Sequence, residues 1–219
     1  MAMTDFSRTR NPDPAPDFPA GGTALSVVVP TFNESANIHE MHRRLDAVLG
    51  DIAWEVIFVD DASPDGTGDV VRELARHDRR VRLIERHDRR GLSSAVVEGA
   101  LAASADVVAV MDGDLQHDES VLPRLYAEIR EGRADIASAS RFLQEDGADG
   151  LSSAARLRMS NTGIRIANRA FGLDLTDPLT GFFAIRRETV IEALPHLSGQ
   201  GFKILLDLLT APLVPPRVV

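Results

Sequence analysis

The 219-residue sequence contains no cysteine, so it has neither a disulfide framework nor a thiolate nucleophile. This fits a reducing compartment. The sequence also has no apolar run that approaches the ~20 residues a helix needs to cross a bilayer. Basic residues are scarcer than acidic ones (24 against 33), and the formal net charge is −9. Because such a chain does not attract nucleic acid through its overall field, we expect no nucleic-acid partner.

Two common nucleotide-binding motifs are absent as well. The chain has no Gly-Lys-Ser/Thr phosphate loop, and the segment Gly66–Val71 lacks the third glycine of a dinucleotide fingerprint. Any phosphorylated ligand must therefore be held by another device, such as a metal ion or local arginines.

Short apolar runs that alternate with helical patterns are what the sequence does contain. The expected strands are Leu25–Val29, Trp54–Val59, Val81–Ile84, Val107–Met111 and Asp135–Ser140, with a further one at Phe182–Arg186. The expected helices cover about 36–49, 69–76, 94–100, 119–130, 154–171, 188–194 and 203–210. This alternation predicts an α/β fold with a mostly parallel, doubly wound sheet flanked by helices.

The domain organisation expected from composition is simple. Residues 1–23 are rich in Pro, Asp and Gly without periodicity, which predicts a disordered leader. Residues 24–219, with the high apolar content of the chain (44%), are expected to form one domain. The last residues, 215–219, read as the entry to another strand, so we expect a C-terminal continuation to be missing.

Two carboxylates follow the most apolar strand directly. Val107–Met111 ends in Asp112-Gly113-Asp114, and open α/β sheets bind ligands outside the carboxyl ends of their strands. Gly113 is expected to let the chain turn so that both carboxylates converge. Two converging carboxylates repel each other unless a cation lies between them. We therefore expect a hard cation, Mg²⁺ or Mn²⁺, and Gln116 can supply a further oxygen ligand. The alternative is that the two aspartates only cap the helix that begins near residue 118.

For other polar residues the sequence is compatible with either a functional or a purely structural role. Asp60 and Asp61 end the second strand and belong either to a site or to a turn. His117 is either a further metal ligand or a solvated turn residue. The segment Arg-His-Asp-Arg-Arg occurs at 76–80 and at 86–90, which predicts a solvated basic rim or, alternatively, contact with lipid head groups.

Six motifs follow one another along the chain, namely Val28–Glu34, Val59–Thr67, Met111–His117, Ser140–Phe142, Asp177–Phe182 and Gly201–Asp207. Together and in this order they resemble motifs of family 2 glycosyltransferases. Within that family they look like those of dolichyl- or polyprenyl-phosphate mannosyltransferases, and the likeness spans about residues 25–219.

The resemblance implies a glycosyltransferase-A fold and an inverting, metal-dependent transfer of mannose from GDP-mannose to a polyprenyl or dolichyl phosphate. By the match, the metal positions are Asp112, Asp114 and Gln116, and the donor nucleotide and phosphate positions are Pro30, Phe32, Glu34, Val59, Asp61, Asp112, Gly113, Asp114, Arg141 and Lys203. The implied catalytic residues are Asp114, Arg141, Arg156 and Ser160, of which the last two match acceptor-phosphate positions. Phe32 stands where the family usually has Tyr, which keeps stacking but loses a hydroxyl.

Three other functions are compatible with the same sequence. One is a UDP-glucose-dependent undecaprenyl-phosphate glycosyltransferase. Another is a sugar nucleotidyltransferase, although its glycine-rich loop after the first strand is absent. A third is a non-catalytic nucleotide-binding module. For Arg141 itself, which follows a predicted strand, the alternative is a surface ion pair. For the mannosyltransferase we expect a peripheral position at the cytoplasmic face of the membrane, where the cationic helix around Arg156 meets the lipid surface.

Overall fold

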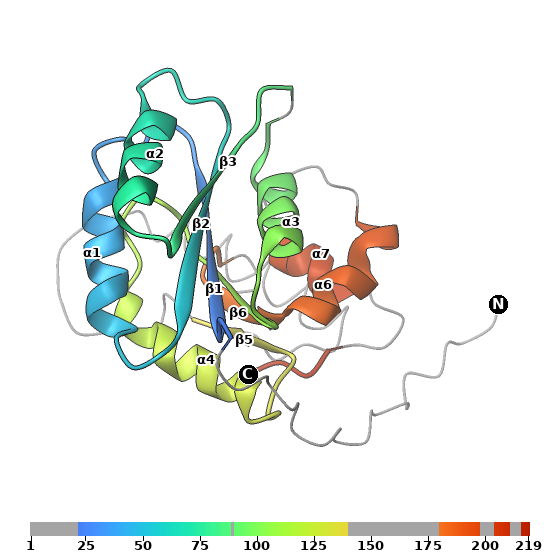
Figure 1. Ribbon diagram of the computed structural model, residues 1–219. Helices are drawn as coiled ribbons and strands as arrows, with labels where there is room; N and C mark the ends of the chain where they lie inside the picture. Colours follow the sequence, from blue (N-terminus) through green and yellow to red (C-terminus); the bar gives the residue numbers. More distant parts are fainter. Residues whose placement is uncertain (1–21, 89, 140–179, 198–203, 211–215) are drawn as a thin grey trace, which may run out of the picture.

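The computed structural model describes residues 22–88, 90–139, 180–197, 204–210 and 216–219 (Figure 1). The predicted leader, apart from Gly22 and Thr23, and the predicted helix over 154–171 lie outside these residues. The strands are β1 (Leu25–Thr31), β2 (Trp54–Asp60), β3 (Val81–Glu85), β4 (Val107–Val110), β5 (Ile136–Ser138) and β6 (Phe183–Arg186). The helices are α1 (Ile38–Val48), α2 (Thr67–His77), α3 (Leu92–Ala102), η1 (Glu119–Val121), α4 (Leu122–Arg130), α6 (Arg187–Ala193), η3 (Leu194–His196) and α7 (Ile204–Thr210).

The strands form one six-stranded sheet in the order β3-β2-β1-β4-β6-β5. The first four of these are mutually parallel, whereas β6 runs antiparallel to both β4 and β5. The predicted mostly parallel sheet is therefore confirmed. The carboxyl ends of β1, β2, β3 and β4 meet at one edge, so the loops that follow these strands are brought together there.

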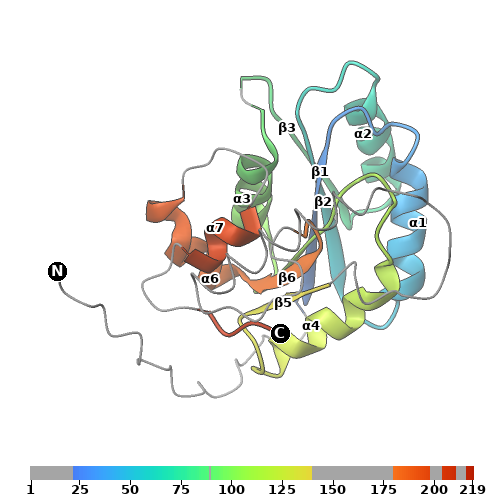
Figure 2. The same cartoon turned by 180° about the vertical axis from the view of Figure 1, so that it is seen from behind.

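Two apolar clusters cover the two faces of the sheet. Helices α1, α2 and α4 pack on one face, and α3, α6 and α7 on the other, as Figures 1 and 2 show from opposite sides. All residues of β1 and β2 are buried, as expected of strands covered on both faces. Helix α3 lies so close to the sheet that a Cβ on Gly99 would come within 2.4 Å of Val28, which explains the glycine.

The first strand continues past the position at which the sequence predicted its end. We expected a strand over Leu25–Val29, but β1 includes Pro30 and ends at Thr31. In a strand with parallel neighbours, every second residue points its backbone N–H and C=O toward the same neighbouring strand. Val28 and Pro30 both point toward β4, since the carbonyl of Val28 accepts from Met111 N on that side. The missing N–H of Pro30 thus faces the space beyond the end of β4, where no ladder bond is lost.

The last described residues lie along the edge of the sheet. Val218 forms a parallel bridge with Ile136 of β5, and Val219 N donates to Ile136 O at 3.1 Å. The strand-like character predicted for 215–219 is thus confirmed for Val218. Among the residues that the structure describes, no helix is both long and apolar enough to cross a membrane.

Candidate active site

The loops at the carboxyl edge of the sheet have unusual backbone conformations. Among the described residues, the non-glycine positions with positive φ are Asn33, Ala62 and Leu115, which follow β1, β2 and β4. Such conformations cost of order 1 kcal/mol or more and cluster at functional sites. Gly113 lies in a turn, as expected, although it is not among the glycines with positive φ. The left-handed residue in this loop is Leu115 (φ 61°).

Acidic side chains gather at this edge, around Glu34. Burial raises the pKa of the Glu34 carboxyl. A hydrogen bond from Asn37 acts in the opposite direction, and the charges of Asp114, Asp65 and Asp112 raise the pKa further, in that order. The two aspartates of the Asp112-Gly113-Asp114 segment and Glu34 therefore lie within electrostatic reach of one another, although they come from different loops.

Asn37 ties two of these loops together. Its Nδ2 donates to Glu34 Oε2 at 2.6 Å and to the carbonyl of Gly113 at 3.3 Å. A Cβ built on Gly113 would lie 3.4 Å from both Glu34 Cγ and Thr31 Cγ2, so the loop after β4 packs directly on the loop after β1. The close approach of the backbone, rather than its conformation, accounts for this glycine.

The carboxylates of this edge fit a hard divalent cation. Within the described residues, no group of three or more His, Asp or Glu side chains is arranged to hold a metal ion by itself. Mg²⁺ in nucleotide sites is usually held by one or two carboxylates, with substrate phosphates and water as the other ligands. Oxygen donors suit Mg²⁺ and Mn²⁺ alike. Asp112 and Asp114 supply two such carboxylates, and Asp114 Oδ1 also accepts from the backbone N–H of Gln116 at 3.1 Å.

The residues predicted to surround the nucleotide occupy neighbouring strand ends. Pro30 and Val59 are paired in register near the ends of β1 and β2, and both are buried. Phe32 is 45% exposed, which is unusual for a large apolar side chain. The guanidinium of Arg90 lies 5.1 Å from the centroid of the Phe32 ring. An exposed ring with a cation over it is a surface on which a planar base stacks well.

Asp61 forms a buried ion pair that the sequence did not reveal. Arg86 Nε donates to Asp61 Oδ1 at 2.7 Å, and the backbone N–H of Gly91 donates to Asp61 Oδ2 at 2.9 Å. The side chain of Arg86 is only 1% exposed. The predicted solvated basic rim is therefore wrong for Arg86, which instead joins the ends of β2 and β3 to the start of α3.

The neighbouring Asp60 is a turn residue, which was the structural alternative that the sequence left open for Asp60 and Asp61. It is fully buried, and its Oδ2 accepts from the backbone N–H of Ser63 at 2.9 Å. Its Oδ1 also accepts from the hydroxyl of Thr31 at 3.2 Å. Asp60 thus closes the turn after β2 and fixes that turn to β1.

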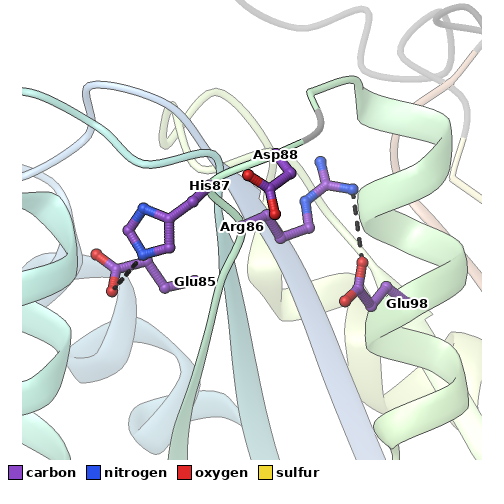
Figure 3. A pocket seen from close by; sticks show the side chains of 5 residues that line it. All are labelled: Glu85, Arg86, His87, Asp88 and Glu98. Atoms are coloured by element: carbon purple, nitrogen blue, oxygen red, sulfur yellow. Dashed lines mark ion pairs between the residues drawn. The ribbon is translucent and has the colours of Figure 1, made fainter.

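A cavity of about 310 Å³ opens beside this ion pair, at the carboxyl end of β3 (Figure 3). Its lining consists of charged or ionisable side chains, namely Glu85, Arg86, His87, Asp88 and Glu98. Two ion pairs cross it, between His87 and Glu85 at 3.4 Å and between Arg86 and Glu98 at 3.8 Å.

Some predicted site residues lie outside the described part of the chain, namely Arg141, Arg156, Ser160 and Lys203. The others lie at the carboxyl ends of β1 and β2 and in the loops after β1, β2 and β4. Sequence reasoning missed Arg86 and Arg90 because both belong to the repeated basic segment. The separation of Asp61 and Arg86 in the sequence does not indicate that they pair. The position of Arg86 directly after a strand could have suggested that it belongs to the site at the strand ends.

A doubly wound α/β sheet, with carboxylates and strained loops gathered at its carboxyl edge, defines this chain as a ligand-binding protein whose site is compatible with a cation. The sequence matches the model of the family "Glycosyl transferase family 2" over residues 26–194, so the chain belongs to that family.

Relatives with curated names cover most of this chain. A dolichol-phosphate mannosyltransferase from Pyrococcus furiosus is 40% identical over 187 residues, which are 84% of this chain and 52% of the relative. One from Saccharomyces cerevisiae is 35% identical over 199 residues, which are 88% of this chain and 73% of the relative. The chain thus spans about half the length of the first of these relatives.

Solved structures share the fold. A mannosyltransferase from Pyrobaculum calidifontis, in complex with GDP-Man and Mn²⁺, has a TM-score of 0.64 at 20% identity, covering 98% of this chain and 58% of that one. Glucosyl-3-phosphoglycerate synthase from Mycobacterium tuberculosis, in complex with Mn²⁺, UDP-glucose and phosphoglyceric acid, has a TM-score of 0.64 at 22% identity, covering 87% and 64%. The predicted glycosyltransferase-A fold and family membership are confirmed.

Proposed function

We propose that this protein transfers mannose from GDP-mannose to a dolichyl or polyprenyl phosphate, with inversion at the anomeric carbon and with Mg²⁺ or Mn²⁺ as cofactor. The observation that carries the proposal is the acidic edge of the sheet, where Asp112 and Asp114 lie near Glu34. Relatives that cover most of the chain are named dolichol-phosphate mannosyltransferase. The lipid acceptor places the reaction at a membrane surface, and we propose its cytoplasmic face.

The proposed donor site runs from Phe32 to Asp114. Phe32, with Arg90 above its ring, supplies a stacking surface for the base. Asp112 and Asp114 would hold the cation, which stabilises the charge that develops on the leaving diphosphate. Arg141 and Lys203, by their match to the family motifs, are proposed to contact the donor phosphates or sugar.

The proposed acceptor needs no general base. An alcohol must lose its proton as it attacks, whereas a lipid phosphate, with a second pKa near ~6 by analogy with phosphorylated side chains, arrives largely as the dianion at neutral pH. His117 is the candidate base at the acidic edge, but its Nε2 lies 3.1 Å from Asp112 Oδ2 and is thus engaged with that carboxylate. The protein's task is therefore to position the acceptor and to compensate its charge, a role that we propose for Arg156 and Ser160.

The proposed donor predicts selective binding of GDP. We expect GDP to bind the protein in the presence of Mn²⁺ about ten-fold more tightly than UDP, a difference of about 1.4 kcal/mol. Calorimetric titration measures both affinities. The same preparation, incubated with a polyprenyl phosphate and labelled GDP-mannose, UDP-glucose or UDP-GlcNAc, should label the lipid only with mannose. Tighter binding of UDP, together with glucose transfer, would favour the undecaprenyl-phosphate glucosyltransferase.

The proposed acceptor site predicts a selective effect of Arg156→Ala. The KM for the lipid phosphate should rise at least about ten-fold, because a hydrogen bond to a charged group contributes roughly 1.5–3 kcal/mol. The KM for GDP-mannose should stay unchanged. Arg158→Ala is the matched control, since residues two apart on the predicted helix face different directions. A weaker donor affinity in Arg156→Ala, without a change in the acceptor KM, would contradict this placement.

A further inference from the structure

The imidazole of His117 is buried against a carboxylate of the acidic edge. Its side chain is 6% exposed, so it is not the solvated turn residue that was one alternative from the sequence. Its Nε2 lies 3.1 Å from Oδ2 of Asp112. An ionised carboxylate only accepts hydrogen bonds, so in this contact Nε2 carries the hydrogen and donates it.

Packing holds the ring of His117 in this orientation. The ring of Phe182 lies 5.0 Å from it, centroid to centroid, at an interplanar angle of 37°. Phe182 is itself 2% exposed and belongs to the apolar cluster on the α1 face of the sheet. Its backbone N–H donates to the hydroxyl of Thr180 at 3.1 Å, which fixes the start of β6. The imidazole therefore rests on a rigid part of the core.

The backbone of Gly181 contacts Asp112 as well. A Cβ built on Gly181 would lie 2.5 Å from Asp112 Oδ2 and 2.8 Å from Oδ1, so a larger residue at this position would displace the carboxylate. The pairing of β6 with β4, in which Val110 is opposite Phe183, brings Gly181 to this place. Asp112 is thus confined by His117 and Gly181, while 38% of its side chain stays exposed.

From this arrangement we infer that His117 is a positioning residue for Asp112, an inference that rests on the proposed function. The hydrogen bond from Nε2 holds Oδ2 and would keep the carboxylate oriented for a divalent cation. A flexible carboxylate would lose rotational freedom on binding a metal, whereas one that is already oriented does not. Partners that orient metal ligands in this way typically contribute 10–100-fold to metal affinity or activity.

Three substitutions separate the hydrogen bond from the packing. His117→Phe keeps an aromatic ring beside Phe182 and removes the donor. His117→Asn keeps a polar side chain but falls one bond short of the Nε2 position. His117→Gln places an amide nitrogen the same number of bonds from Cβ as Nε2, so it can restore the donor. Mn²⁺ binding to the protein–GDP complex, followed by the electron paramagnetic resonance signal of free Mn²⁺, reports on the site without any turnover.

We expect His117→Phe and His117→Asn to weaken Mn²⁺ binding about ten-fold or more, and His117→Gln to remain within about three-fold of the unsubstituted protein. Binding of GDP without metal should not change in any of them. His196→Phe, at an exposed position in η3, is the matched control and should bind Mn²⁺ normally. If His117→Phe folds poorly, which a melting curve without metal would reveal, His117→Asn and His117→Gln supply the same comparison.

The outcomes separate this inference from the proposed function. Equal Mn²⁺ affinity in the Phe, Asn and Gln variants would overturn the positioning role. A protein that shows the expected order of affinities but transfers no mannose would support the positioning role and overturn only the proposed function. A protein that binds no Mn²⁺ in the presence of GDP would overturn both.

Discussion

Asp114→Asn is expected to reduce mannose transfer at least ~100-fold, the scale of losing one group that stabilises transition-state charge. The side chain of Asp114 is exposed at the sheet edge, and its charge acts on the Glu34 carboxyl. The amide has nearly the same shape but no charge, so it removes one negative charge from the proposed cation site and replaces one of the two carboxylate oxygens by an NH2 group. The measurement is kcat at saturating GDP-mannose and polyprenyl phosphate, over a range of Mn²⁺ concentrations.

Asp118→Asn is the matched control for this change. Asp118 lies four residues further along the same loop, and its Oδ1 accepts from the backbone N–H of Ser120 at 3.0 Å. Because Asn caps a helix about as well as Asp, the fold should not suffer and the activity should stay close to that of the unsubstituted protein. Full activity of Asp114→Asn, or full activity in the presence of a chelator, would contradict the proposed metal role.

Local sequence pattern was sufficient to predict the parallel part of the sheet. The Val-rich runs in β1, β2 and β4 have the length and composition of strands buried on both faces, and all three are strands in the structure. The carboxylates at the end of β4 predicted a site at the carboxyl edge of the sheet, because a buried strand has no need of acid at its end.

The place of β6 could not be predicted, because its pairing is not local. This strand is separated from β4 by more than seventy residues of sequence, yet it inserts between β4 and β5 and runs antiparallel to both. The short run Phe182–Arg186 reads as a strand but carries no information about its neighbours. For the same reason the contacts of Gly181 and Phe182 with Asp112 and His117 are not visible in the sequence.

Identical local sequence also led to different environments. Arg76 and Arg86 begin the same five-residue segment, but the side chain of Arg76 is 72% exposed and that of Arg86 is 1% exposed. Arg76 lies on the outer face of α2. Arg86 follows β3 directly, and its backbone N–H donates to Asp60 O at 2.8 Å, which turns its side chain toward Asp61. Tertiary position, which a local pattern does not encode, decides between the two.

Arg86→Met is expected to lower the free energy of unfolding by about 3–5 kcal/mol, since removing one partner of a buried ion pair leaves the other charge without compensation. The side chain of Asp61 is 12% exposed and would keep only the hydrogen bond from Gly91. Arg86 also bonds the carbonyl of Gly91 at 3.0 Å and the hydroxyl of Ser94 at 2.8 Å, so the start of α3 would lose two more contacts. Urea unfolding, followed by circular dichroism, measures the change.

Two further variants test whether the effect comes from the uncompensated charge of Asp61. The double variant Asp61→Asn with Arg86→Met removes both charges but keeps an oxygen that accepts from Gly91 N, so it should be more stable than Arg86→Met alone. Arg72→Met breaks ion pairs with Asp69 and Glu85 at an exposed site, where the expected loss is below about 1 kcal/mol. If Arg86→Met cost no more than Arg72→Met, the pair would contribute no more than a surface contact. The loop after β2 would then be held mainly by other contacts, such as the hydrogen bonds that Asp60 accepts from Ser63 and Thr31.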